Sequence, residues 1–102
     1  MGKSTTLERL ILNDNKLEGE IPKEIGRLSS LSMLSLNGNR LEGRIPTELF
    51  QCINLTTLDL GKNHLNGTIP KDIGMLVQLE CLVLSLNDIS GPIPTEIALG
   101  FQ

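Results

Sequence analysis

Aromatic residues are nearly missing from this 102-residue sequence, which has no tryptophan, no tyrosine and an aromatic content of 2%. A core without aromatic rings has to be filled by aliphatic side chains, and this favours regular layers over an irregular interior. Hydrophobic residues make up 39% of the chain and charged residues 21%, so the chain can bury a core and is not composed like a disordered segment. The length suits one domain.

An excess of positive charge is also missing, because the formal net charge is -3. We therefore expect no nucleic-acid partner and no attraction to an anionic membrane. No apolar run approaches the roughly 18 residues of a membrane span, and the first residues lack the apolar segment of a signal peptide. As written, the sequence is expected to stay in the cytoplasm.

Cysteine and histidine are scarce, with two cysteines and one histidine in the chain. Two cysteines cannot build a disulfide-rich scaffold. No nucleophile, base or group of metal ligands in the sequence forms a catalytic or metal-binding motif. We therefore expect no enzymatic activity, no cofactor and no metal.

The sequence does contain an internal repeat. It divides into four 24-residue units, 7–30, 31–54, 55–78 and 79–102. Aliphatic residues recur at the first, fourth, sixth and eleventh places of each unit. The ninth place is always asparagine: Asn15, Asn39, Asn63 and Asn87. Such a regular recurrence does not arise from composition alone.

The first part of each unit predicts a short strand. In Leu-x-x-Leu-x-Leu the apolar residues alternate with others at period two, as in a strand that buries one face. We expect the leucines to point inward and the residues between them to point outward. The asparagine that follows can donate to and accept from backbone groups of neighbouring units. The four asparagines are therefore expected to form a ladder inside the turn.

The second part of each unit, Leu-x-Gly-x-Ile-Pro, predicts a bend and then a short helical turn. The glycine permits the bend, the proline fixes φ, and an acidic residue follows two places later. Proline at the first helical position with an acid at the third is a helix-start signature. We expect one such turn on the convex side of each unit, anchored by Ile25, Leu49, Ile73 and Ile97.

The whole pattern, Leu-x-x-Leu-x-Leu-x-x-Asn-x-Leu-x-Gly-x-Ile-Pro, resembles the plant-specific class of the leucine-rich repeat family. The resemblance implies an α/β repeat fold, a right-handed solenoid with an inner parallel sheet and short helical turns on the convex side. The best-known members are ectodomains of plasma-membrane receptor-like kinases and receptor-like proteins. Within that class, residues 58–61 and 79–85 are similar to the receptor kinase of anther cell fate that is named for excess microsporocytes.

The ends of the sequence depart from the family pattern. Family ectodomains usually have more repeats, closed by caps with paired cysteines, and neither cap is present here. Residues 1–6 match the tail of a preceding repeat, since Met1 and Gly2 stand where Ile25 and Gly26 stand in the first unit. We therefore expect either a truncated array or a small stand-alone product derived from a longer receptor.

The outward residues of the predicted strands form two columns on the inner sheet, and they are the candidate contacts for a partner: Arg9, Met33, Thr57 and Cys81, then Ile11, Ser35, Asp59 and Val83. This neutral mixture with scattered apolar groups suits a polypeptide better than phosphate or sugar. The resemblance implies a non-catalytic protein-interaction module that binds a peptide, a small protein or a receptor in plant signalling. Its narrower form implies anther or male-organ development.

The uncapped ends support a second hypothesis. Each repeat buries its core only against its neighbours, so terminal units without caps leave leucines and a strand edge open. End-to-end pairing would cover them, either in a homo-oligomer or by docking onto a longer leucine-rich repeat receptor as a regulator or decoy. The sequence supports both hypotheses.

The cysteines and two glycosylation motifs bear on the compartment. The repeat register places Cys52 in a buried convex column and Cys81 outward on the inner sheet, so we expect two free thiols. Asn54 and Asn66 begin Asn-x-Thr motifs that fit N-glycosylation. The receptor resemblance implies a plasma-membrane or extracellular location, whereas the sequence as written would leave both motifs unmodified.

Overall fold

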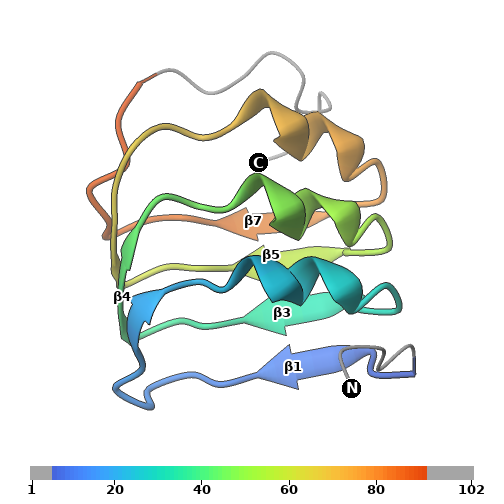
Figure 1. Ribbon diagram of the computed structural model, residues 1–102, viewed down its shortest axis with the longest axis horizontal. Coiled ribbons are helices and arrows are strands. Elements are labelled where there is room, and N and C mark those ends of the chain that lie inside the picture. The colour runs from blue at the N-terminus through green and yellow to red at the C-terminus, as the bar shows by residue number, and fades with distance from the viewer. Residues whose placement is uncertain (1–5, 92–102) are drawn as a thin grey trace.

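The inner sheet consists of one strand from each unit. A computed structural model describes residues 6–91 and shows a parallel sheet in the order β1-β3-β5-β7. Its strands are β1 (Arg9–Ile11), β3 (Met33–Ser35), β5 (Thr57–Asp59) and β7 (Cys81–Val83). Figure 1 shows these strands stacked from one coil to the next. Leu10 faces Leu34 and Leu34 faces Leu58, so the register of this sheet equals the sequence period.

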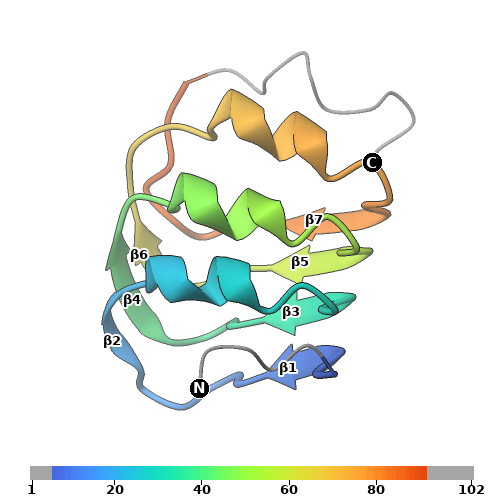
Figure 2. The ribbon, with the colours of Figure 1, turned by 45° about the vertical axis from the view of Figure 1, so that its right-hand side comes forward.

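Short 3-10 helices cover the opposite side of the coils. They are η1 (Lys23–Arg27), η2 (Thr47–Gln51) and η3 (Lys71–Met75), and they lie in one layer in front of the sheet in Figures 1 and 2. The predicted leucine-rich repeat solenoid, with an inner parallel sheet and short helical turns, is therefore confirmed. The anchors Ile25, Leu49 and Ile73 are buried, whereas Ile97 lies outside the described residues.

The expected place of the prolines was wrong by one residue. Pro22, Pro46 and Pro70 precede the helices as N-cap residues, with extended ψ angles of 139°, 137° and 142°. The acidic residue is consequently second in each helix and not third. The fixed φ of proline directs the chain into the helix from outside it.

A second, shorter sheet lies at the side of the coils, between the inner sheet and the helices (Figure 2). Its strands are parallel, in the order β2 (Glu18–Glu20), β4 (Arg40–Gly43) and β6 (His64–Leu65). Its register differs from that of the inner sheet. Glu18 faces Arg40, and Glu42 faces His64, so partners are 22 residues apart. Residues from different places of successive units therefore meet on this sheet.

The core fills the space between the sheets and the helices. Leucines at the predicted inward places are most deeply buried in the second and third units, where Leu34 is 0% and Leu58 is 1% exposed. One aromatic ring joins them, because Phe50 of η2 is 1% exposed. The equivalent leucines of the first unit, Leu7, Leu10 and Leu17, pack against this core but are only partly buried.

The ninth-place asparagines bind the backbone of adjacent coils. The Asn63 side-chain oxygen accepts a hydrogen bond from the Leu41 N–H at 3.1 Å, and its amide nitrogen donates to the carbonyls of Leu36 and Leu60 at 3.0 and 3.2 Å. Asn39 is bonded in the same manner to the first and second coils. Among residues 6–91, no buried polar side-chain atom lacks a hydrogen-bond partner. The amides thus satisfy turn groups that the strands leave unpaired.

Candidate functional site

The outward face of the inner sheet carries the candidate contacts in two columns. The sheet register aligns residues 9, 33, 57 and 81 in one column and residues 11, 35, 59 and 83 in the other. Their exposure differs along each column: Arg9, Ile11 and Cys81 are exposed, Met33, Thr57, Asp59 and Val83 are half-buried, and Ser35 is buried. The accessible part of this face therefore combines polar and apolar groups.

Ser35 offers almost no surface to a partner, because only 3% of it is exposed. Its hydroxyl donates to Oδ1 of Asn13 at 2.7 Å, and the same oxygen accepts the N–H of Asn37 at 3.0 Å. Asn13 belongs to the turn of the preceding coil, 22 residues earlier. The strand pattern within one unit gives no signal for this contact, so the sequence placed Ser35 among the accessible residues.

Asp59 lies at the end of β5, in the interior of the sheet. Its Oδ1 accepts two hydrogen bonds, from Nδ2 of Asn37 and from the N–H of Gly61, each at 3.0 Å. Asn37 comes from the preceding coil and Gly61 from the same coil. Two neutral donors therefore fix the orientation of this carboxylate.

Leu86 is an exposed apolar residue beyond the eight candidate contacts. It follows β7, is 68% exposed and has a φ of 61°. The equivalent residues of the other units, Asp14, Gly38 and Lys62, also have positive φ. A positive φ raises the free energy of a residue that has a β-carbon. An apolar residue at a turn position is the sequence signal that points to Leu86 as a further contact.

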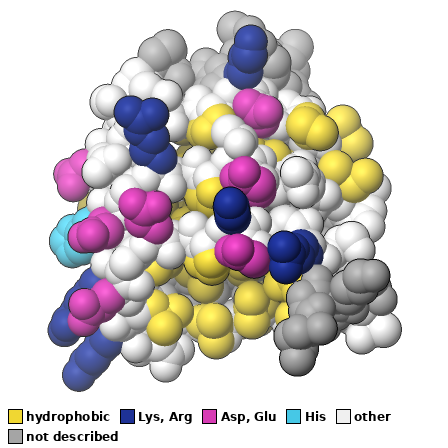
Figure 3. Space-filling view, viewed as in Figure 1, with side chains coloured by type: hydrophobic (Ala, Val, Ile, Leu, Met, Phe, Trp, Pro, Cys, Tyr) yellow, Lys and Arg dark blue, Asp and Glu magenta, His cyan; other side chains and the backbone are white. Residues whose placement is uncertain are grey.

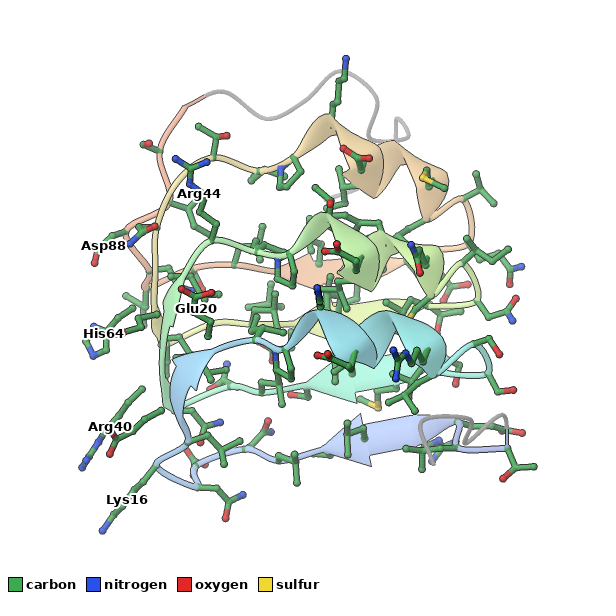
Figure 4. The ribbon with its side chains drawn as sticks, in the orientation of Figure 1. Lys16, Glu20, Arg40, Arg44, His64 and Asp88 are labelled. Carbon is green, nitrogen blue, oxygen red and sulfur yellow. The ribbon has the colours of Figure 1, made fainter. Side chains whose placement is uncertain are left out.

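The second sheet presents charged side chains at the side of the molecule. Figure 4 shows Lys16, Arg40 and His64 pointing away from the coils there. Arg40 forms an ion pair of 3.9 Å with Glu18, and both side chains are largely exposed. Glu18, Arg40, Glu42 and His64 also line a shallow hollow. Exposed ion pairs of this kind contribute little to stability.

The helix side differs from the sheet in its apolar groups. Figure 3 shows charges of both signs over the helices and hydrophobic side chains at the right edge and along the bottom of the view. Exposed hydrophobic residues on this part of the coils include Ile53, Met75 and Val77, with exposures of 50%, 52% and 77%. Ile53 and Val77 hold the same place of successive units, 24 residues apart, beside helices instead of strands.

The two cysteines occupy the environments expected from the repeat register. Cys52 is fully buried, and its thiol donates to the Ile25 carbonyl at 3.3 Å. Burial raises the pKa of the Cys52 thiol because the thiolate is poorly solvated there. Cys81 is exposed on the inner sheet, and both thiols are free.

The two glycosylation motifs differ in their hydrogen bonding. Asn54 is exposed, but its side-chain nitrogen donates to the Ser29 carbonyl of the preceding coil at 3.1 Å. Asn66 is exposed beside β6, and its backbone N–H donates to the Gly43 carbonyl at 2.9 Å. Both asparagines therefore lie on the surface of the coils.

Between residues 6 and 91 there is no group of three or more His, Cys, Asp or Glu side chains that could hold a metal ion. No helix in the same part of the chain is long and apolar enough to cross a membrane.

Comparisons with known proteins identify the class. The family model for the Leucine Rich Repeat matches residues 6–28, 30–52, 54–76 and 78–99, so the chain belongs to the leucine-rich repeat family. No curated protein matches the sequence closely. Among solved structures, the chain resembles plant receptors of this family.

One similar chain comes from the PEPR1–AtPEP1 complex, with 44% identity and a TM-score of 0.91. Another comes from the complex of the Arabidopsis receptor kinase HAESA with the peptide hormone IDA and the co-receptor SERK1, with 43% identity and a TM-score of 0.88. Each alignment covers 94% of this chain, but only 14% and 16% of the respective receptor chain. The chain thus spans only a small part of the length of the receptor chains that it resembles.

A plant ice-binding protein has the same fold. It is 36% identical with a TM-score of 0.87, and the alignment covers 93% of this chain and 31% of that protein. Proteins of one fold can therefore bind quite different targets, and function has to be argued from the surface residues.

Proposed function

We propose that the chain is a non-catalytic interaction module that binds a polypeptide on the outward face of the inner sheet, in plant signalling at the plasma membrane or outside the cell. The partner is a peptide, a small protein or another receptor. Similar chains come from receptor complexes with peptides and with a co-receptor. The likeness of residues 58–61 and 79–85 to the excess-microsporocytes receptor makes anther tissue the first place to look for the partner.

The observation that carries the proposal is the composition of that face. Ile11 is 51% exposed and Met33 and Val83 are half-buried, and these apolar side chains stand among polar residues. Parallel strands hold these side chains in fixed columns, which lowers the entropy that a partner has to overcome on binding. Protein interfaces use such mixtures of apolar contact and oriented polar groups.

A displayed library of random 12-residue peptides tests the proposal with the purified 102-residue chain. We expect peptides that bind wild type to lose affinity for Thr57→Arg on the sheet, but not for Val77→Arg on the opposite side. Thr57 is half-buried at the centre of the sheet, and Val77 is exposed beside the helices. The proposal fails if no peptide binds, or if Thr57→Arg binds the selected peptides as well as wild type does.

End-on association is the second candidate. The first coil leaves Leu12 37% exposed, and β1 lies at the edge of the inner sheet. A second copy or a longer receptor of this family could pair with that edge strand and cover the leucines. Light scattering distinguishes the cases, since self-association predicts a dimer or larger species that Leu12→Lys dissociates. A monomer at all concentrations excludes the homo-oligomer.

A further inference from the structure

The environment of Asp59 differs from that of its neighbour in the same column. Ser35 is covered, because Asn13 from the preceding coil accepts its hydroxyl hydrogen. Asp59 receives hydrogen bonds from Asn37 and Gly61 on Oδ1 only, and it remains half-buried instead of buried. The second oxygen, Oδ2, accepts no hydrogen bond from residues 6–91.

The charge of Asp59 also has no counter-ion within the described part of the chain. The ion pair present there joins Arg40 to Glu18, on the second sheet. The groups that hold the Asp59 carboxylate are an amide and a backbone N–H, both neutral. The carboxylate is therefore oriented but not neutralised, in the interior of the sheet that faces a partner.

Glycine at position 61 lies next to this carboxylate, and its N–H donates to Oδ1. The equivalent place is Asn13 in the first unit and Asn37 in the second. A β-carbon at Gly61 would lie 3.0 Å from Nδ2 of Asn37 and 3.3 Å from Oδ1 of Asp59. A larger residue there would press on the bonds that orient Asp59, so the glycine preserves their geometry.

From this arrangement we infer that Asp59 binds a cationic side chain, lysine or arginine, of the polypeptide partner. The inference rests on the proposed function and specifies its chemistry. Oδ1 already accepts two hydrogen bonds, so the cation donates to Oδ2. A bidentate contact of an arginine with both carboxylate oxygens is not required. Val83, which faces Asp59 in the register, provides apolar surface for the methylene stem of such a side chain.

The test uses the same random 12-residue peptide library on three forms of the full chain: wild type, Asp59→Asn and Asp72→Asn. Asparagine at 59 can still accept both hydrogen bonds, so the fold is retained while the charge is lost. Asp72 is exposed in η3 on the helix side and controls for the change in net charge. We expect lysine and arginine to be enriched among binders of wild type and Asp72→Asn, and not among binders of Asp59→Asn.

Selected peptides then allow a quantitative comparison. Asp59→Asn should weaken a cationic peptide about 10- to 100-fold, the range for a hydrogen bond to a charged group. Replacing the peptide's lysine or arginine with glutamine should cause the same loss in wild type and little further loss in Asp59→Asn. Exchanging lysine for arginine in the peptide shows which cation is preferred.

The outcomes separate the two hypotheses. If wild type selects peptides without cationic enrichment, or if Asp59→Asn selects the same cationic peptides, the role of Asp59 is wrong while peptide binding stands. If wild type selects no peptides, the proposed function itself fails, and the inference fails with it.

Discussion

The first coil and the third coil have the same sequence pattern but very different burial. At the sixth place of the unit, Leu12 is 37% exposed, whereas Leu60 is 0% exposed. The third coil is covered on both sides by strands β3 and β7, and β1 has a strand neighbour on one side only. The leucine pattern therefore selects which side chains face inward, but a neighbouring coil provides most of their burial.

The asparagines differ between these coils for the same reason. Asn39 and Asn63 are 6% and 5% exposed, whereas Asn15 is exposed and, within residues 6–91, its side chain bonds only the Asn13 carbonyl of its own turn. The Asn39 oxygen instead accepts the N–H groups of Asn15 and Leu17, one coil earlier. Each of these amides supports the coil before it, so the ladder has a direction along the solenoid.

Cavity-forming substitutions should show the largest difference in stability between the two coils. We expect Leu58→Ala to lower the free energy of unfolding by about 2–5 kcal/mol, because it empties space in a fully buried site. Leu10→Ala, at the same place in the partly buried first coil, should cost about 1 kcal/mol. Urea denaturation followed by circular dichroism measures both. Equal losses would show that the first coil is as well packed as the third.

The two thiols provide a comparison without any substitution. Cys81 should react with a thiol reagent in the native protein at least about 100-fold faster than Cys52, which becomes accessible only on opening of the fold. The pKa of the Cys52 thiol is raised in the folded state, so its contribution to stability is complete below the unfolded-state pKa and is lost as the pH rises through the folded-state pKa. Mass spectrometry after timed alkylation checks the rates. Simultaneous labelling of both thiols would contradict the buried position of Cys52.

Removal of a ladder amide should have a smaller effect that again depends on the coil. Asn63→Ala leaves the Leu41 N–H without its partner and removes one of the two amide donors to the Leu36 carbonyl, to which Asn39 still donates, and we expect a loss of about 1–3 kcal/mol. Asn15→Ala removes one exposed bond and should change stability by less than about 0.5 kcal/mol. The same urea titration applies, and a large loss in Asn15→Ala would show that the first coil depends on its own asparagine.

Relief of backbone strain at Leu86 should cause the smallest change in the free energy of unfolding, and this change is a gain where the others are losses. Leu86→Gly should raise the free energy of unfolding by up to about 1 kcal/mol, since glycine adopts the φ of 61° without a steric penalty. Leu86→Ala shortens the exposed side chain but retains the penalty, so it serves as the matched control. Thermal unfolding of the two variants measures the difference. A gain in Leu86→Ala equal to that in Leu86→Gly would assign the effect to the exposed side chain.

The sequence predicted those features that follow from places recurring at the 24-residue period. The inner-sheet register, the inward leucines, the buried Cys52 and the helical turns all follow from places that recur within 24 residues. The burial of Ser35 could not be predicted in this way, because the covering amide of Asn13 belongs to another coil. The orientation of Asp59 by Asn37 has the same origin. Both contacts join different places of successive units, and the repeat pattern does not specify which of these side chains meet.

The 22-residue register of the second sheet has a consequence for protein engineering. The tenth-place Arg40 pairs with the twelfth-place Glu18 of the unit before it, and His64 lies opposite Glu42 in the same manner. A chimera that imports residues 31–54 alone would take Arg40 into the recipient scaffold and leave its partner Glu18 behind in this chain. A graft between proteins of this fold should therefore begin in the preceding unit, at or before Glu18. The unit to be grafted is therefore one coil together with the second-sheet strand of the coil before it.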